Sequence, residues 1–444
     1  MLKLKTIMLS FFILLSIIQT IHLWLGGSLS HIFFEETAVS TLSPISPKNI
    51  WVNTGGNYTH SYLIPNEQQE YEDIIAELQQ ALLNYTDFTD AQYKTQDISQ
   101  LFNQQGLIYE YSLPVTIDEI VGKPIPLNYN YKINTVFIKI SDSNIADNNI
   151  YFINYLEDYY IEIILQDGTY EFTNIYSLFN TNDTKYQPSI KDIKSQFIQG
   201  NVFLANISNT LPIIYTNIIF KNELQQDNFD IQNIERYIDH FFEKPIMKEI
   251  SLLLGGTIEF IESQKNLIRY SNRGTIQYIN LSPNTFTTPM SKLEGYNIVM
   301  DFINSTDSIH PTIKNRLYVS DIKIEQEAYV YYLDIIKNGH TIILNENLQT
   351  ALEINSAIEI KVKNHNIIEG KWITYSLEEE YSYIKYQFTE GYSVPIDKMY
   401  SMLQAQNVEQ PKFENVELVY ELSSINKGIP IKWGVKYNGR WHFP

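Results

Sequence analysis

The stretch 329-YVYYLDIIKNGHTIIL-344 carries the strongest turn signal in the chain. Its Asn-Gly pair, at 338–339, stands between two apolar runs. This dipeptide is typical of the two-residue turn that joins antiparallel strands, because both of its positions tolerate a positive φ. A second Asn-Gly pair, at 438–439, follows the apolar run 429–437. The two pairs predict two β-hairpins, and antiparallel sheet structure around them.

Further strands and a few helices are expected outward from these hairpins. Apolar and polar residues alternate in the strand candidates, and apolar residues recur at three- and four-residue steps in the helix candidates. The pattern predicts an α+β fold of antiparallel sheets with flanking helices. The expected strands are 107–113, 135–140, 159–165, 169–172, 257–262, 266–271, 275–281, 358–362, 372–375, 381–388, 416–422 and 429–437, and the expected helices are 67–85, 230–243 and 395–406.

The length of the chain allows several domains. About 415 of its 444 residues follow the N-terminal apolar run, and single cores stop growing at about 250–300 residues. Clusters of Asn, Thr, Asp and Pro mark the candidate boundaries. We predict a cytoplasmic tip and transmembrane helix at 1–30, a linker at 31–48, a first α+β domain at 49–183, a central α+β domain at 184–320 and a mostly β C-terminal domain at 321–444.

One apolar run, Ile7 to Leu25, is long enough to cross a bilayer. Nineteen helical residues make roughly 28 Å, close to the ~30 Å hydrocarbon thickness. Lys3 and Lys5 precede the run while Glu35 and Glu36 follow it, so the positive-inside rule predicts a cytoplasmic N-terminus. A cleaved signal peptide is the alternative, but the run is longer than the usual apolar region and no convincing cleavage motif follows. We expect a single-pass protein of the cell membrane, with its bulk extracytoplasmic.

Three polar side chains share one face of this span. Ser16, Gln19 and Thr20 stand at i, i+3 and i+4, which places them together on a helix. An unpaired Gln amide is costly in hydrocarbon, and Ser, Thr and Gln are the side chains that hydrogen-bond between membrane helices. The alternative is a plain anchor in which Ser and Thr bond to their own backbone. We interpret this face as a contact surface for a partner helix.

Composition excludes several classes of function. With 32 basic and 51 acidic residues the net charge is −19, which repels phosphate backbones and argues against nucleic-acid binding. The absence of cysteine rules out disulfides, thiol catalysis and thiolate metal sites. No two of the eight histidines have the i, i+4 spacing of a zinc-protease helix. His365, near Glu369, is interpreted as a solvated turn residue.

Nucleophile and phosphate-binding motifs are also absent. The segment GYSVP at Gly391 lacks the last glycine of G-x-S-x-G, which leaves Ser393 as a turn residue. The glycine pairs at Gly26, Gly55 and Gly255 have no dinucleotide-binding or P-loop pattern. The loop around Asp142 lacks the ligand spacing of a calcium site. We predict no catalytic residues, cofactor or metal ligands, and no enzymatic activity.

Acidic pairs keep one enzymatic alternative open. Glycoside hydrolysis needs two carboxylates roughly 5–10 Å apart. A tethered wall-active glycoside hydrolase is therefore one alternative function, and a glycan- or peptide-binding module is another. The candidate carboxylates are Glu259 with Glu262, Glu157 with Asp158, and the run Glu378 to Glu380, which are otherwise interpreted as solvated surface residues.

The order of several segments resembles a known family, the YycH regulators of the Yyc (Wal) sensor-kinase system of low-G/C Gram-positive bacteria. The resemblance runs almost end to end. It is carried by SFFILLSIIQTIHLW (10–24), IYEYSLPVTIDEIVGKPIPLNYNYK (108–132), YIDHFFEKPIMKEISL (237–252), LIRYSNRGTIQYINL (267–281) and IPIKWGVKYNGRWHFP (429–444).

The resemblance implies a single-pass protein with a multi-domain α+β exterior that is not an enzyme. It further implies two partners: the regulator YycI, and the membrane sensor histidine kinase that governs cell-wall metabolism. Binding would involve both the span and the exterior.

Replacing Ser16, Gln19 and Thr20 together with Leu tests the proposed helix face. The variant should still insert, because Leu is more apolar than any of the three, but it should recover less partner in a membrane two-hybrid assay. Unchanged recovery would remove this face from the hypothesis.

Overall fold

The computed structural model describes residues 42–55, 60–64, 66, 69–84, 92–95, 98–124, 131–140, 149–155, 157–164, 172–180, 187–191, 203–205, 213–222, 224, 231–253, 255–262, 265–283, 289–386, 393–425 and 427–444. None of the helices in these ranges is long and apolar enough to span a membrane. The predicted span, Ile7 to Leu25, lies outside them.

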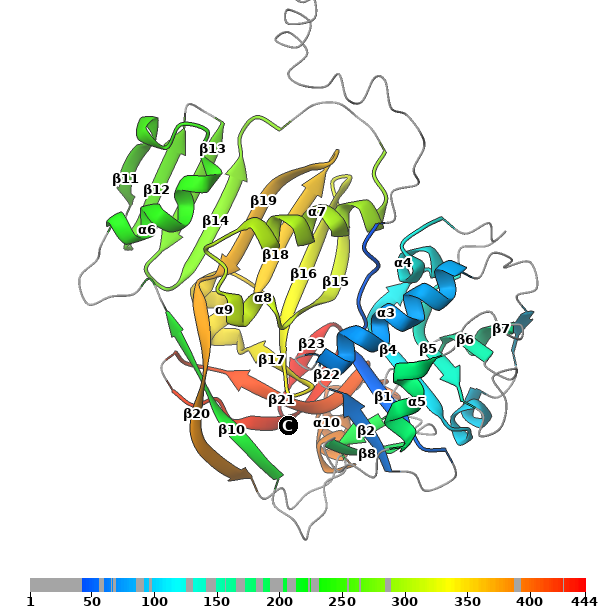
Figure 1. The fold of residues 1–444 in the computed structure, drawn as a ribbon. Helices are drawn as coiled ribbons and strands as arrows, with labels where there is room; N and C mark the ends of the chain where they lie inside the picture. Colours follow the sequence, from blue (N-terminus) through cyan, green and yellow to red (C-terminus); the bar gives the residue numbers. More distant parts are fainter. Residues whose placement is uncertain are drawn as a thin grey trace, which may run out of the picture. The chain divides into compact units, whose positions relative to one another are not determined.

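The N-terminal part of the described chain forms a nine-stranded sheet of antiparallel neighbours (Figure 1). All five residues of its strand β1 are buried. The strand order is β3-β7-β6-β5-β4-β1-β2-β8-β9. Their bounds are β1 (Asn49–Asn53), β2 (His60–Ile64), β3 (Gln92–Lys94), β4 (Gly106–Val115), β5 (Ile133–Lys139), β6 (Asn149–Asn154), β7 (Tyr159–Ile164), β8 (Gln187–Lys191) and β9 (Phe203–Ala205).

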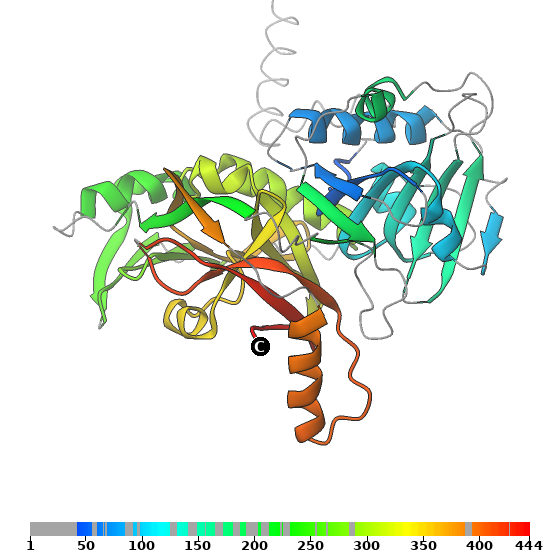
Figure 2. The same cartoon turned by 90° about the horizontal axis from the view of Figure 1, so that it is seen from below.

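Helices cover this sheet. Helix α3 (Gln69–Asn84) lies along one face (Figure 2), and the predicted stripe of Ile74, Ile75, Leu78, Ala81 and Leu82 is buried there. The predicted helix at 67–85 is thus confirmed. The other helices of this part are η2 (Ile98–Asn103), α4 (Ile117–Val121) and α5 (Thr173–Asn180).

The rest of the described chain forms a twelve-stranded sheet. Its order is β11-β12-β13-β14-β19-β18-β16-β17-β21-β22-β23, and β15 pairs with the free side of β16. The bounds are β11 (Glu249–Leu253), β12 (Thr257–Glu262), β13 (Asn266–Ser271), β14 (Thr275–Asn280), β15 (Leu317–Glu325), β16 (Ala328–Lys337), β17 (His340–Leu344), β18 (Ile358–Lys363), β19 (Asn366–Ile373), β21 (Asn415–Leu422), β22 (Ile431–Tyr437) and β23 (Arg440–His442). Beside it, β10 (Ile213–Asn222) pairs with β20 (Tyr375–Tyr386).

Both predicted hairpins are confirmed. Asn338 and Gly339 have φ values of 51° and 77°, and they join β16 to β17. Asn438 and Gly439 have φ values of 50° and 73°, and they join β22 to β23. Positive φ at both central positions is what the two-residue turn requires. The predicted meander is also formed, by β12, β13 and β14.

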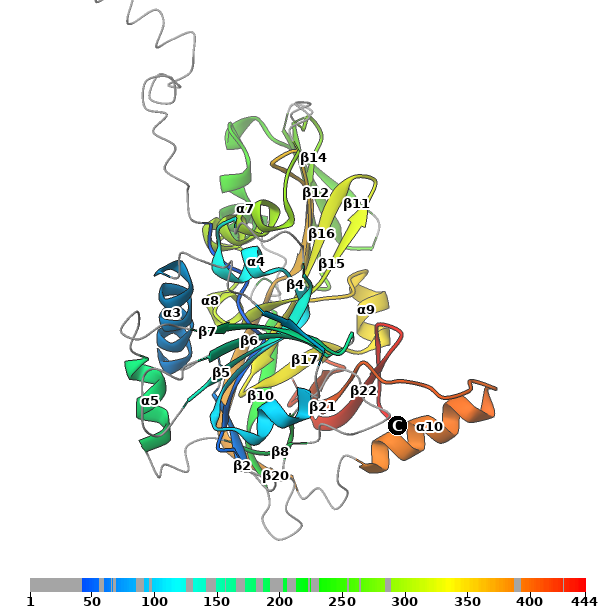
Figure 3. The same cartoon turned by 90° about the vertical axis from the view of Figure 1, so that its right-hand side faces the viewer.

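Helices pack against the twelve-stranded sheet as well. Helix α7 (Lys292–Ser305) contacts β16, β18 and β19, and a capping box of Ser291 and Glu294 begins it. Helix α10 (Ser393–Ala405) packs on β22 and extends away from the sheet (Figure 3), which confirms the helix predicted at 395–406. The remaining helices are α6 (Ile231–Ile238), η4 (Asp239–Phe241), η5 (Pro245–Met247), α8 (Pro311–Lys314) and α9 (Glu346–Leu352).

Two details differ from the sequence prediction. The α-helix expected over 230–243 ends at Ile238 and continues as a 3₁₀ turn. The buried Glu262 carboxylate accepts hydrogen bonds from the backbone N–H groups of Glu243 and Lys244, just after this turn, so these donors are not available to a helix. In the sheet, β17 and β21 are parallel rather than antiparallel.

The predicted boundaries at 30/31 and 183/184 lie outside the described residues. The one between 320 and 321 lies within β15, and the twelve-stranded sheet takes strands from both sides of it. Of the strand expected at 169–172, only residue 172 is described, just before α5. The α+β class with antiparallel sheets is confirmed, and the division into domains stays a prediction.

Residues 43–48, at the end of the predicted linker, pack against both sheets. Asn297 of α7 accepts a hydrogen bond from the Ser43 backbone N–H at 2.8 Å and donates one to the Ser43 carbonyl at 3.0 Å. The Ile45 N–H donates to the carbonyl of Glu119 in α4 at 2.9 Å, and the Ile45 side chain is buried. Lys48 is buried too.

Substituting Gly339 with Ala should destabilise the protein more than the same change at Gly439. Both glycines have positive φ, which costs an Ala about 1 kcal/mol. A Cβ at Gly339 would lie 1.8 Å from Leu63 Cδ2, whereas one at Gly439 meets nothing within 4 Å. The clash with a buried side chain should add about 1–3 kcal/mol. Chemical denaturation of the two variants measures the difference, and equal losses would contradict the packing of Gly339 on Leu63.

Candidate functional site

A buried ion pair joins the two sheets. Lys48, just before β1, places Nζ 2.7 Å and 2.8 Å from the two carboxylate oxygens of Glu417 in β21. The side chains are only 5% and 14% exposed. Thr341 Oγ1 donates a further hydrogen bond to Glu417 at 3.0 Å, and Lys48 Nζ lies 5.5 Å from the centre of the Tyr318 ring. The buried charges are therefore compensated on several sides, as a desolvated pair requires.

His340 lies beside this pair and is buried. Its Nδ1 is 2.9 Å from the carbonyl oxygen of Leu418. Burial lowers the pKa of His340 to about 4; Glu417 and the Leu418 carbonyl oppose this shift, and Lys48 adds to it. The imidazole is therefore neutral at neutral pH.

A large cavity opens next to this junction. It has a volume of about 1560 Å³, and β4, β15, β16, α9, α10, β21 and the β22–β23 hairpin contribute to its lining. A smaller cavity of about 140 Å³ shares part of the lining and is also bordered by Lys48 and Glu110. Burial raises the pKa of the Glu110 carboxyl, against the charge of Lys48 and hydrogen bonds from Asn49 and Trp51. Polar and charged side chains contribute to the lining of both cavities.

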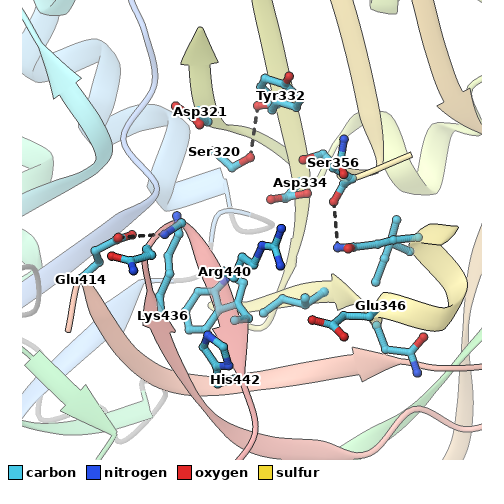
Figure 4. Close-up of a pocket in the computed structure, with 18 of the residues that line it drawn as sticks. Ser320, Asp321, Tyr332, Asp334, Glu346, Ser356, Glu414, Lys436, Arg440 and His442 are labelled. Atoms are coloured by element: carbon cyan, nitrogen blue, oxygen red, sulfur yellow. Dashed lines mark hydrogen bonds between the residues drawn. The ribbon is translucent and has the colours of Figure 1, made fainter. Parts of the chain in front are cut away.

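Charged side chains of opposite sign line two walls of the large cavity (Figure 4). Asp334 of β16 lies on one wall, where burial raises the pKa of its carboxyl; hydrogen bonds from Ser320 and Ser356 and the charge of Lys436 oppose the shift. Lys436, Arg440 and His442 come from the β22–β23 hairpin on the other wall.

Most acidic groups of the lining have partners within the protein. Glu414 accepts a hydrogen bond from the Gly439 N–H at 2.8 Å, and Glu353 lies 3.5 Å from Lys371. By contrast, in the part of the chain that the structure describes, the charged ends of Lys436 and Arg440 form no hydrogen bond or ion pair. The cavity therefore offers two cations for a ligand.

The site residues predicted from sequence, Ser16, Gln19 and Thr20, lie outside the described residues. Among the carboxylate candidates, Glu259 accepts a hydrogen bond from Arg269 at 2.7 Å, and Glu262 accepts only backbone N–H groups. In the run 378–380, Glu379 lies 2.7 Å from the buried Lys337. Glu157 and Asp158 are exposed in the turn between β6 and β7.

The interpretation of His365 as a solvated turn residue is confirmed, because it is exposed in the β18–β19 turn with a φ of 59°. The interpretation of Ser393 as a turn residue is wrong, because Ser393 is the exposed first residue of helix α10. Gly55 and Gly255 have φ values of 80° and 84°. Asp142 and Gly26 lie outside the described residues. Within those residues, no group of three or more His, Cys, Asp or Glu side chains is placed to hold a metal ion.

Sequence reasoning did not single out the cavity residues. Asp334 had a visible signal, since it is the one acidic residue in the otherwise apolar run 329–336. Lys436 and Arg440 flank the second Asn-Gly turn, but their convergence with Asp334 depends on how β15 and β16 lie against β22.

No family model matches the chain, and no curated protein matches it. Among solved structures, YycH from Bacillus subtilis is similar with a TM-score of 0.54 and 14% sequence identity, over 90% of this chain and 95% of that chain. An uncharacterized protein from Eubacterium rectale gives a TM-score of 0.36 and 12% identity, over 58% of this chain and 93% of that chain. The chain therefore has a YycH-like fold, and its membership in the family stays a prediction.

His340 should make the stability of the protein depend on acidity. Its folded-state pKa of about 4 lies below the ordinary value of 6.5, so its contribution is fully present above pH 6.5 and is lost as the pH falls toward 4. The loss is about 3 kcal/mol at about 1.4 kcal/mol per pH unit. Between pH 7 and 4, the free energy of unfolding should fall less steeply in His340→Gln than in the wild type. The exposed His365→Gln should retain the wild-type slope, and a wild-type slope in His340→Gln would refute the assignment.

Proposed function

We propose that the protein is a membrane-anchored extracytoplasmic regulator of a sensor histidine kinase of cell-wall metabolism. The observation that carries the proposal is the YycH-like fold, which extends over 90% of the chain. The order of the sequence segments that resemble YycH regulators, from residue 10 to residue 444, supports it independently.

In the proposed mechanism, the protein shifts the equilibrium between two signalling states of the kinase. The N-terminal span would contact the kinase and a YycI-like regulator through Ser16, Gln19 and Thr20, and the exterior would hold the assembly together. A regulator of this kind acts only if its contacts differ between the two states of the kinase. The charges of Lys3, Lys5, Glu35 and Glu36 support a single-pass topology with a cytoplasmic N-terminus.

The proposed role needs no catalysis. Three of the carboxylates considered for glycoside hydrolysis, Glu259, Glu378 and Glu379, have cationic partners. Glu262 is buried against backbone N–H groups. A glycosidase pair needs one carboxylic acid and one carboxylate facing a substrate across a cleft. The large cavity has Asp334 with a raised pKa and five further acidic residues. Of these five, Asp321, Glu353 and Glu421 pair with lysines, and Glu414 accepts the Gly439 N–H.

Affinity purification of the intact protein from its own membrane, followed by mass spectrometry, tests the proposal. A sensor histidine kinase and a second single-pass regulator should be recovered. The matched control is the same chain with residues 7–25 replaced by a polyleucine span, which keeps the anchor but removes the polar face, and it should recover less of both. Recovery of neither partner with the intact protein would overturn the proposal.

A further inference from the structure

Two strand edges border the large cavity. Among the described strands, β15 pairs only with β16, and β23 pairs only with β22. Residues of both edges line the cavity, including Ser320 and Asp321 of β15 and Arg440 and His442 of β23. The Val319 carbonyl on the outer edge of β15 already accepts a hydrogen bond from the Ser112 hydroxyl of β4, so the parts of the two edges left for a ligand are the C-terminal half of β15 and β23. An unpaired strand edge presents backbone N–H and C=O groups that an extended chain can satisfy by adding as a further strand.

The charged side chains of the cavity indicate which chemical groups such a ligand should carry. Lys436 and Arg440 extend from the hairpin wall toward the wall that carries Asp334 (Figure 4). Arg and Lys are the residues that recognise carboxylates, Arg with a planar pair of donors. Asp334 can accept a hydrogen bond from an amide or ammonium group of the ligand. A ligand with both a carboxylate and N–H donors would match both walls.

Other ligand classes fit less well. A neutral glycan would supply no carboxylate to hydrogen-bond with Lys436 and Arg440. A polyphosphate carries several negative charges and would be repelled more strongly than a single carboxylate by the acidic lining residues, of which there are six: Asp321, Asp334, Glu346, Glu353, Glu414 and Glu421. The volume of about 1560 Å³ exceeds the ~300–1,000 Å³ of usual small-molecule pockets, so it can hold a chain of several residues. Met399, Met402 and Trp441 offer apolar contacts for its side chains.

We propose that this cavity binds a short extended peptide whose carboxylate contacts Arg440 and Lys436 and whose backbone adds to one of the two bordering strand edges. The binding does not rest on the regulatory role, because it requires neither a kinase nor the N-terminal span. Failure of one proposal is therefore distinguishable from failure of the other.

Affinity-selection mass spectrometry on the full-length protein in detergent tests the peptide site. The probes are two synthetic pentapeptide pools of identical sequences, one with free C-terminal carboxylates and one amidated. The wild type should retain members of the free-acid pool, and their amidated counterparts should bind at least tenfold more weakly. Retention of no free-acid peptide, or equal retention of both pools, would overturn the proposal.

Variants locate the binding within the cavity. The double variant Lys436→Ala with Arg440→Ala should weaken binding of the retained peptides at least tenfold, while its melting temperature stays close to the wild-type value. Folding should be kept because neither charged end bonds to the described protein. The matched control is Lys412→Ala, an exposed lysine outside the lining, which should bind like the wild type. Wild-type binding by the double variant would refute the site.

A third pool identifies the source of the peptide. It contains the same sequences with alternating L- and D-residues and free carboxylates, as in peptides of the cell wall, whereas the all-L pool represents fragments of exported proteins. Preferential retention of either pool supports the proposal and assigns the ligand to one source.

Discussion

The ion pair of Lys48 and Glu417 is the contact on which the arrangement of the two sheets depends. These residues are 369 positions apart in the sequence, yet their charged ends are in direct contact and nearly buried. Burying two charges costs several kcal/mol per ion, and removing one partner of such a pair typically costs about 3–5 kcal/mol. A docking of the sheets that separated the pair would leave both charges desolvated and uncompensated. The pair therefore favours one register of the sheets over its neighbours.

The cavity follows from this docking. Its walls include Ser112 to Pro114 of β4 from the first sheet, together with β15, β16 and β22 of the second. The Ser112 hydroxyl donates a hydrogen bond to the Val319 carbonyl, which fastens β4 to the outer edge of β15. Lys48 and Glu110 border the smaller cavity that shares this lining. The same contacts that hold the sheets together thus shape the space between them.

Local sequence patterns predicted local structure well and distant contacts poorly. The two hairpin turns depend on their own Asn-Gly pairs, and helix α3 depends on the apolar spacing from Ile74 to Leu82. Both patterns involve residues close together in the sequence, and both predictions are confirmed. Helix α7 was not predicted because polar residues interrupt its apolar stripe. The capping box of Ser291 and Glu294 that begins it is present in the sequence. The parallel pairing of β17 with β21 joins segments about 80 residues apart, as Ile342 with Tyr420, and no local pattern encodes it. The cavity is formed by such distant contacts. Of the cavity residues discussed above, only Asp334 had a recognisable sequence signal, as an acidic residue in an apolar run.

The packing of residues 43–48 has a mechanical consequence. Within six residues the chain is fastened to α7 on the second sheet through Asn297, to α4 on the first through Glu119, and to β21 through Glu417. Such a segment is a rigid coupling rather than a hinge. If an occupied cavity changed the angle between the sheets, the strain would be concentrated at these three fastenings, within the first described residues of the chain.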